Sequence, residues 1–218
     1  PVDPKNCKHY DREIYKYRIK ITKSGILRYF SHLDWQNTFF KAVSRTGLDV
    51  VFSQGFNPTM KISMGIALPL FVESECELVD IELFEDIPAE NLKLKLEKVL
   101  PPEAEIISIV KINKSAPAID VTAQWAEYKI SVFNEDIYDF ETLKYNTDRV
   151  LSSEEIFIEK KNKKGLLKKI NIKSSIQSYR YEDNSLFIVL KTGQNQTAPN
   201  QQGEIEAQNV PAALRADV

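Results

Sequence analysis

A chain of 218 residues that is 43% hydrophobic and 28% charged can bury a sizeable core, as one large domain or two small ones. Its formal net charge of -2 excludes nucleic-acid binding driven by overall charge, so a nucleic-acid surface would need a local basic cluster. No apolar run approaches the roughly 20 residues that span a bilayer. The only cysteines, Cys7 and Cys76, match no metal-ligand or redox spacing, and no secretory signal is present, so we expect a cytoplasmic location.

The first predicted elements are a strand and an amphipathic helix, which follow a polar leader over residues 1–14. The leader starts with proline rather than methionine, so we expect the chain to be trimmed or cut from a longer polypeptide. Apolar residues alternate from Tyr15 to Ile21, the pattern of a half-buried strand. From Ser31 the apolar period becomes that of a helix, for which Gly47 is a suitable end.

Extended segments are then predicted at residues 48–52, 66–72 and 76–84, a helix from Pro88 to Pro101, and a strand at residues 104–112. Pro69 disfavours segment 66–72 as a central strand. The remaining order, strand, helix, strand, strand, helix, strand, is that of the split βαβ, ferredoxin-like fold, in which two helices cover one face of an antiparallel sheet. We therefore predict an α+β protein whose first domain covers residues 15–113.

Residues 114–122 are predicted to be a linker, followed by a second, smaller α+β unit over residues 123–192. The predicted unit has a strand at 126–133, a helix at 139–151 and strands at 155–161, 168–181 and 185–192. Turns are expected at Lys164-Gly165 and Asp183-Asn184. The polar segment 193–218 has few large apolar residues, so we expect it to be poorly ordered.

The stretch Ser31-His32-Leu33-Asp34 allows two interpretations. In the structural one, Ser31 is the helix N-cap and Asp34, three residues on, completes a capping box. In the functional one, His32 is a donor, acceptor or proton carrier at a pocket rim, kept mainly uncharged by its place in the first helical turn. The second interpretation makes His32 and Asp34 the candidate catalytic residues.

The loop "FSQGFNPTMKIS", residues 52–63, has the composition of a stiff turn, because Gly55 permits a positive φ and Pro58 fixes the chain after Asn57. Phe56 and Lys61 are not needed for a turn and indicate a binding role. In a split βαβ unit this loop is expected at the same edge of the sheet as the start of the first helix. We therefore predict that His32 and the loop lie side by side and form one recognition edge.

The segment "EKKNKKGLLKK" carries the strongest basic cluster of the chain. It is either a solvated hairpin or a ribbon that faces phosphates, and the nearby tyrosines, Tyr179 and Tyr181, either stack on bases or pack on the sheet. The predicted phosphate-facing residues are Lys160, Lys161, Lys163, Lys164, Lys168 and Lys169.

Three motifs, "KSGILRYFSHLD", "FSQGFNPTMKIS" and "ESECELVDIEL", resemble the radical SAM-linked protein family, DUF2344. The resemblance covers about residues 15–192 and departs from the family at Thr59 and Met60, where the family usually has His-Pro. We call the residues that carry it the signature residues. They are Arg28, Ser31, His32, Asp34, Ser53, Gln54, Gly55, Phe56, Asn57, Pro58, Lys61, Ser63, Glu73, Ser74, Asp80 and Glu82.

The resemblance implies a partner or fused radical S-adenosylmethionine enzyme that supplies an iron-sulfur cluster and S-adenosylmethionine, since this chain lacks a C-x-x-x-C-x-x-C motif. No cofactor or metal site is expected in the chain itself. The leading hypothesis is an accessory module that recognises substrate, with tRNA or rRNA as the expected class, through Arg28, Ser31, His32, residues 53–57, Lys61 and the six lysines. The alternatives are an enzyme that uses His32 and Asp34 as an acid-base pair, and a docking domain for the radical SAM subunit.

Overall fold

The computed structural model describes residues 12–132, 139–161 and 166–192, in an α+β fold. The chain divides into two compact units, residues 1–119 and 120–218. The division falls inside the segment predicted as a linker. That segment includes the short helix α3 (Ile119–Thr122), and the carbonyl of Pro117 accepts a hydrogen bond from Arg18 of the first unit at 2.8 Å.

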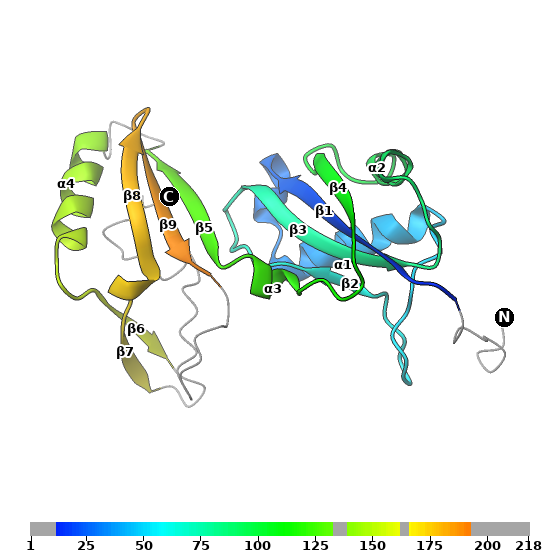
Figure 1. The fold of residues 1–218 in the computed structure, drawn as a ribbon. Coiled ribbons are helices and arrows are strands. Elements are labelled where there is room, and N and C mark those ends of the chain that lie inside the picture. Colours follow the sequence, from blue (N-terminus) through cyan, green and yellow to red (C-terminus); the bar gives the residue numbers. More distant parts are fainter. Residues whose placement is uncertain (1–11, 133–138, 162–165, 193–218) are drawn as a thin grey trace. The chain divides into compact units, whose positions relative to one another are not determined.

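The first unit is a four-stranded antiparallel sheet with the order β2-β3-β1-β4, as predicted for a split βαβ fold (Figure 1). Its helices follow β1 and β3, and a short 3-10 helix, η1, separates β1 from α1. The elements are β1 (Tyr15–Lys23), η1 (Gly25–Tyr29), α1 (His32–Arg45), β2 (Ile62–Met64), β3 (Ser74–Leu83), α2 (Ala89–Glu97) and β4 (Ile106–Ile112).

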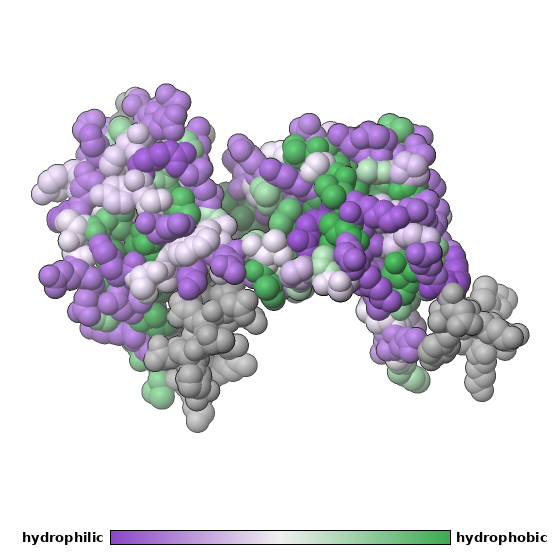
Figure 2. Space-filling model, viewed as in Figure 1, coloured by the Kyte–Doolittle hydropathy of each residue, from purple (hydrophilic) through white to green (hydrophobic). Residues whose placement is uncertain are grey.

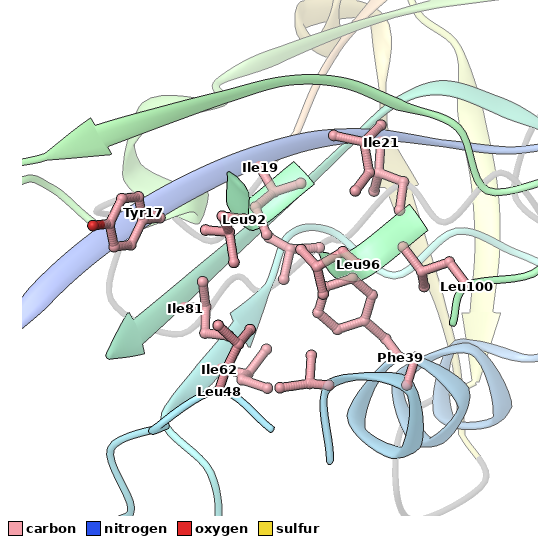
Figure 3. Packing of buried hydrophobic residues seen from close by; sticks show 14 of the residues in the cluster. Tyr17, Ile19, Ile21, Phe39, Leu48, Ile62, Ile81, Leu92, Leu96 and Leu100 are labelled. Atoms are coloured by element: carbon pink, nitrogen blue, oxygen red, sulfur yellow. The ribbon is translucent and has the colours of Figure 1, made fainter. Parts of the chain in front are cut away.

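The core of this unit lies between the sheet and its two helices. The alternation along β1 places Tyr17, Ile19 and Ile21 on the covered face, where each is fully buried. Phe39 of α1 and Leu92 of α2 pack against them (Figure 3). Burial of each such side chain contributes about 1.5–3 kcal/mol to the stability of the fold. These contacts hold α1 against the sheet, with its first turn near the end of β1.

Two predicted extended segments of this unit do not form strands. Segment 48–52 makes only isolated bridges at Val50 and Phe52, and the strand beside β3 is β2, which begins inside the predicted loop. The amide of Val51 and the carbonyl of Lys61 both bond to Glu82, so the intervening residues leave the sheet as a hairpin. Segment 66–72 contains a turn instead of a strand, in which Phe71 has a φ of 68°.

The second unit has the antiparallel sheet β5-β9-β8 and a separate two-stranded ribbon, β6-β7. Its core lies under α4, where Leu186, Ile188 and Leu190 of β9 are buried. The elements are β5 (Trp125–Ser131), α4 (Phe140–Leu151), β6 (Phe157–Lys161), β7 (Leu167–Asn171), η2 (Lys173–Ser175), β8 (Ile176–Glu182) and β9 (Ser185–Lys191).

The predicted strand 168–181 is wrong as a single element, because η2 divides it into β7 and β8. The side chain of Asn171 accepts bonds from the amides of Ile156 and Lys173, and Ile172 is buried, so the chain bends there. The turn at Asp183-Asn184 is confirmed, since both residues have positive φ, as a type I′ hairpin turn requires. The turn at Lys164-Gly165 and the tail 193–218 lie outside the described residues. No helix within the described ranges is both long and apolar enough to span a membrane.

Candidate recognition site

The start of α1 is a complete capping box. The amide of Asp34 donates to Ser31 Oγ at 3.2 Å, and the amide of Ser31 donates to Asp34 Oδ2 at 3.3 Å. Ser31 Oγ also donates to Asp34 Oδ2 at 2.6 Å. These bonds satisfy backbone donors that a helix start leaves without partners, so the capping prediction is confirmed. Within the described residues no hydrogen bond joins Asp34 to His32, and the carboxylate serves the cap.

His32 lies beside the buried Lys23, the last residue of β1, and Lys23 in turn lies near the partly buried Glu77 of β3. Burial lowers the pKa of His32, and the nearby Lys23 lowers it further. Lys23 is only 1% exposed, and its Nζ donates to the carbonyl of Phe30 at 2.9 Å. Burial lowers the pKa of Lys23, and the nearby carboxylate of Glu77 partly offsets this shift. Burial also raises the pKa of Glu77. His32 is therefore mainly neutral near pH 7, as predicted, through burial and Lys23.

Lys23 and Glu77 were not among the predicted site residues, although the sequence contains a signal for Lys23. The inward positions of β1 are Tyr17, Ile19 and Ile21, and the same alternation continues to position 23. A lysine at an inward position must find a polar partner inside the protein or lose its charge. No pattern in the sequence connects it to Glu77, because that contact depends on the pairing of β1 with β3.

Two exposed aromatic rings contact each other near the end of η1. Tyr29 and Phe71 make an edge contact with ring centroids 5.8 Å apart. The Phe71 ring is 65% exposed, and its amide donates to the carbonyl of Arg28 at 2.7 Å. Arg28 also donates to the Tyr29 hydroxyl, and Glu73 accepts a bond from the amide of Gly25 at 2.9 Å. We call Tyr29 and Phe71 the aromatic pair.

The hairpin that follows Val51 carries the second group of signature residues, and it stands away from the rest of the unit (Figures 1 and 2). Ser53 and Thr59 close it, because the Ser53 amide donates to the Thr59 carbonyl at 2.7 Å and the Thr59 amide donates to Ser53 Oγ at 2.9 Å. Gln54, Gly55, Phe56 and Asn57 are exposed at the tip. Gly55 has a φ of 147°, which residues other than glycine rarely adopt. Phe56 is 100% exposed.

Lys61 lies at the base of the hairpin. Its Nζ is 3.3 Å from Glu82 Oε2, so the cation that we predicted to face a ligand is paired with another signature residue. Asp80, the preceding acidic signature residue of β3, pairs with Arg18 at 2.7 Å and Lys16 at 3.0 Å. These acidic residues therefore organise the sheet and the base of the hairpin.

The prediction that His32 and the hairpin share one edge is wrong. Lys23, beside His32, pairs with Ser74 at the start of β3, whereas the hairpin is attached at Glu82, eight residues further along that strand. At 3.3 Å per residue the two places are about 26 Å apart. The error arose because segment 48–52 does not run the length of the sheet before the loop begins. In Figure 1 the hairpin projects near the start of β1, and α1 begins near the other end of that strand.

The lysine-rich segment forms part of the ribbon β6-β7. In its register Lys160 is opposite Lys168, and Glu159 is opposite Lys169. Lys168 and Lys169 are exposed, as are Leu166 and Leu167. Lys161 ends β6, and Lys163 and Lys164 lie outside the described residues. The described residues contain no group of His, Cys, Asp and Glu that would hold a metal ion.

The sequence matches a family model over residues 16–200, and the model is described as "Uncharacterized protein conserved in bacteria (DUF2344)". The chain belongs to this family. The match includes both units, from β1 to beyond β9, so the two units together carry the family pattern. No curated protein matches the chain.

Proposed function

We propose that this member of the DUF2344 family is an accessory recognition module of a radical S-adenosylmethionine enzyme, and that its substrate class is RNA, such as tRNA or rRNA. The observation that carries the proposal is Phe56. It is fully exposed at the tip of a hairpin whose base is fixed by hydrogen bonds. An aromatic ring that stands in solvent offers a free face on which an unpaired base can stack.

The position of Phe56 suits a stacking role. Sequence-tolerant RNA binding uses aromatic side chains on which unpaired bases stack, together with cations that contact phosphates. The exposed Lys168 and Lys169 of the ribbon provide cations in a chain whose overall charge is close to neutral. Recognition by this protein would then depend on local clusters rather than on its total charge.

The structure of the signature residues favours recognition over catalysis. Asp34 completes the cap of α1, and within the described residues it makes no hydrogen bond with His32. Its geometry therefore offers no support for proton transfer between Asp34 and His32. The two cysteines do not make the three-cysteine motif that a radical SAM cluster needs, so the cluster and S-adenosylmethionine would belong to the partner enzyme.

The test is the affinity of the full chain for labelled tRNA, measured by fluorescence anisotropy at low salt. Phe56→Ala should weaken binding at least about fivefold, because one base stacked on an aromatic ring contributes about 1–3 kcal/mol. Leu94→Ala is the control, since Leu94 is an exposed apolar residue of α2 in the same unit. Equal affinities of wild type and Phe56→Ala, or no binding by either, would refute the proposal.

A second candidate function, docking to the radical SAM partner, is favoured by the aromatic pair. The left-handed conformation of Phe71 is unfavourable for a phenylalanine, yet it holds the ring in solvent. Exposed Tyr, Phe and Arg side chains are typical of the centre of a protein interface. Phe71→Gly removes the ring and keeps the backbone conformation, so it should abolish co-purification of the partner enzyme with unchanged tRNA affinity. Retained co-purification would exclude this docking surface.

A further inference from the structure

The sheet of the second unit has one face toward the core and one toward solvent. On β9, Leu186, Ile188 and Leu190 are buried on the side of α4 (Figure 1). The residues between them, Phe187 and Val189, belong to the opposite face, which we call the open face. Cross-strand pairing adds residues of β5 and β8 to it. They are Trp125, Glu127, Lys129, Ser178, Arg180 and Glu182.

Aromatic rings on the open face each lie beside a cation. Lys191 Nζ is 5.9 Å from the ring centroid of Trp125, its register partner on β5. Phe187 of β9 has a cation on each neighbouring strand. Lys129 Nζ of β5 is 5.6 Å from the Phe187 ring centroid, and Arg180 Cζ of β8 is 4.3 Å from it. Trp125 and Lys129 are four residues apart on β5, so the two aromatic positions are about 13 Å apart along the strands.

The charges of the open face leave an excess of cations. Both of its carboxylates, Glu127 and Glu182, pair with Arg180 and hold the guanidinium over Phe187. Within the described residues, Lys129 and Lys191 form no ion pair. Two lysines, one beside each aromatic position, therefore remain to attract a chain of negative charges.

The two tyrosines of β8 that could have stacked on bases, Tyr179 and Tyr181, do not belong to the open face. Tyr179 and Tyr181 are in register with Ile188 and Leu186, on the side of α4. The Tyr181 hydroxyl donates to Asp148 Oδ1 at 2.8 Å, and burial followed by this bond raises the pKa of Tyr181. Tyr181 is thus part of the core contacts, and the aromatic residues of the open face are Trp125 and Phe187.

We propose that the open face binds single-stranded RNA, with one unpaired base on the indole of Trp125 and another on the guanidinium that covers Phe187. The proposal rests on the RNA-binding function proposed above and narrows its substrate class. A flat sheet with separate stacking planes requires bases that are already unstacked, which excludes a regular duplex. The lysine beside each plane matches the phosphates that connect successive bases.

Tryptophan fluorescence reports directly on this contact, because Trp125 is 40% exposed whereas Trp35 is 1% exposed in the core of the first unit. The full chain is titrated at low salt with a short unstructured RNA oligonucleotide and, separately, with an RNA duplex of equal length. Only the single strand should quench the fluorescence, and Trp125→Phe should remove most of the quenchable signal. Trp125→Leu and Phe187→Leu should each weaken single-strand binding at least about fivefold.

Tyr145→Leu is the matched control, because Tyr145 is an exposed aromatic on α4, which packs on the other face of the sheet, and its affinity should stay at the wild-type value. The inference is overturned if single strand and duplex bind equally, neither quenches the fluorescence, and Trp125→Leu and Phe187→Leu keep the wild-type affinity. That result leaves the RNA-binding function intact. Absence of RNA binding by the wild type overturns the proposed function as well. Retained RNA affinity in Trp125→Leu with loss of a co-purifying protein would identify the open face as a protein interface and also overturn the inference.

Discussion

Removal of the Asp80 carboxylate should strongly destabilise the first unit. Asp80 is 3% exposed and lies between two cations, Arg18 and Lys16, with which it makes contacts of 2.7 and 3.0 Å. Arg18 binds both carboxylate oxygens and also the carbonyl of Pro117. Asp80→Ala leaves two largely buried cations without a counter-charge, and the expected cost is about 3–5 kcal/mol in the free energy of unfolding.

The assay is urea unfolding followed by tryptophan fluorescence in a Trp125→Phe background, so that Trp35 reports on the first unit alone. Glu97→Ala is the control, because its partner Lys93 is 3.7 Å away on the solvent side of α2, and the pair is worth less than about 0.5 kcal/mol. A loss below about 1 kcal/mol for Asp80→Ala would refute the reasoning, since it would mean that water replaces the carboxylate without cost.

The further predictions concern the capping box, His32 and Phe71. Ser31→Ala and Asp34→Ala should each lower the free energy of unfolding by about 1 kcal/mol and should not be additive in thermal melts, because they break the same capping box; full additivity would contradict this. His32 should titrate below its ordinary pKa of 6.5 in NMR spectra and shift upward in Lys23→Met; no shift would exclude Lys23 as a cause. The pKa of His32 is lower in the folded than in the unfolded state, so the unfolded state takes up the proton first as the pH falls below 6.5. The wild type should therefore lose stability relative to His32→Gln as the pH falls, and a gain in its relative stability would refute the burial of His32. Phe71→Gly should change the free energy of unfolding by less than about 1 kcal/mol, whereas Phe71→Val should cost more, since a β-branched residue is least suited to a φ of 68°; equal effects in urea unfolding would contradict the strain.

The parts of the fold that could be predicted depend on local patterns. The alternation from Tyr15 to Ile21 predicts the buried face of β1, and the spacing of Ser31 and Asp34 predicts the cap of α1. Both signals arise from neighbouring residues on one element. The strand order followed from the sequence of elements, since the split βαβ arrangement is one of few that short connections allow.

The errors concern interactions between distant segments. Turn residues in "FSQGFNPTMKIS" show that the chain reverses, but they do not show that Val51 and Lys61 both bond to Glu82. The position of the hairpin depends on those bonds, and therefore the shared edge with His32 was wrong. The open face was missed for the same reason, because Trp125 and Phe187 share one face of the sheet only through the pairing of β5 with β9.

The salt dependence of RNA affinity tests the central claim most directly. For the full chain and labelled tRNA, the logarithm of the affinity should fall steeply with the logarithm of the salt concentration. The variant Lys168→Ala/Lys169→Ala should bind more weakly with a slope shallower by up to about two units, and Lys41→Ala/Lys98→Ala, which removes two exposed lysines of the first unit, should keep the wild-type slope. Binding that is absent or insensitive to salt, or equal slopes in the two double variants, would contradict RNA recognition through the β6-β7 ribbon.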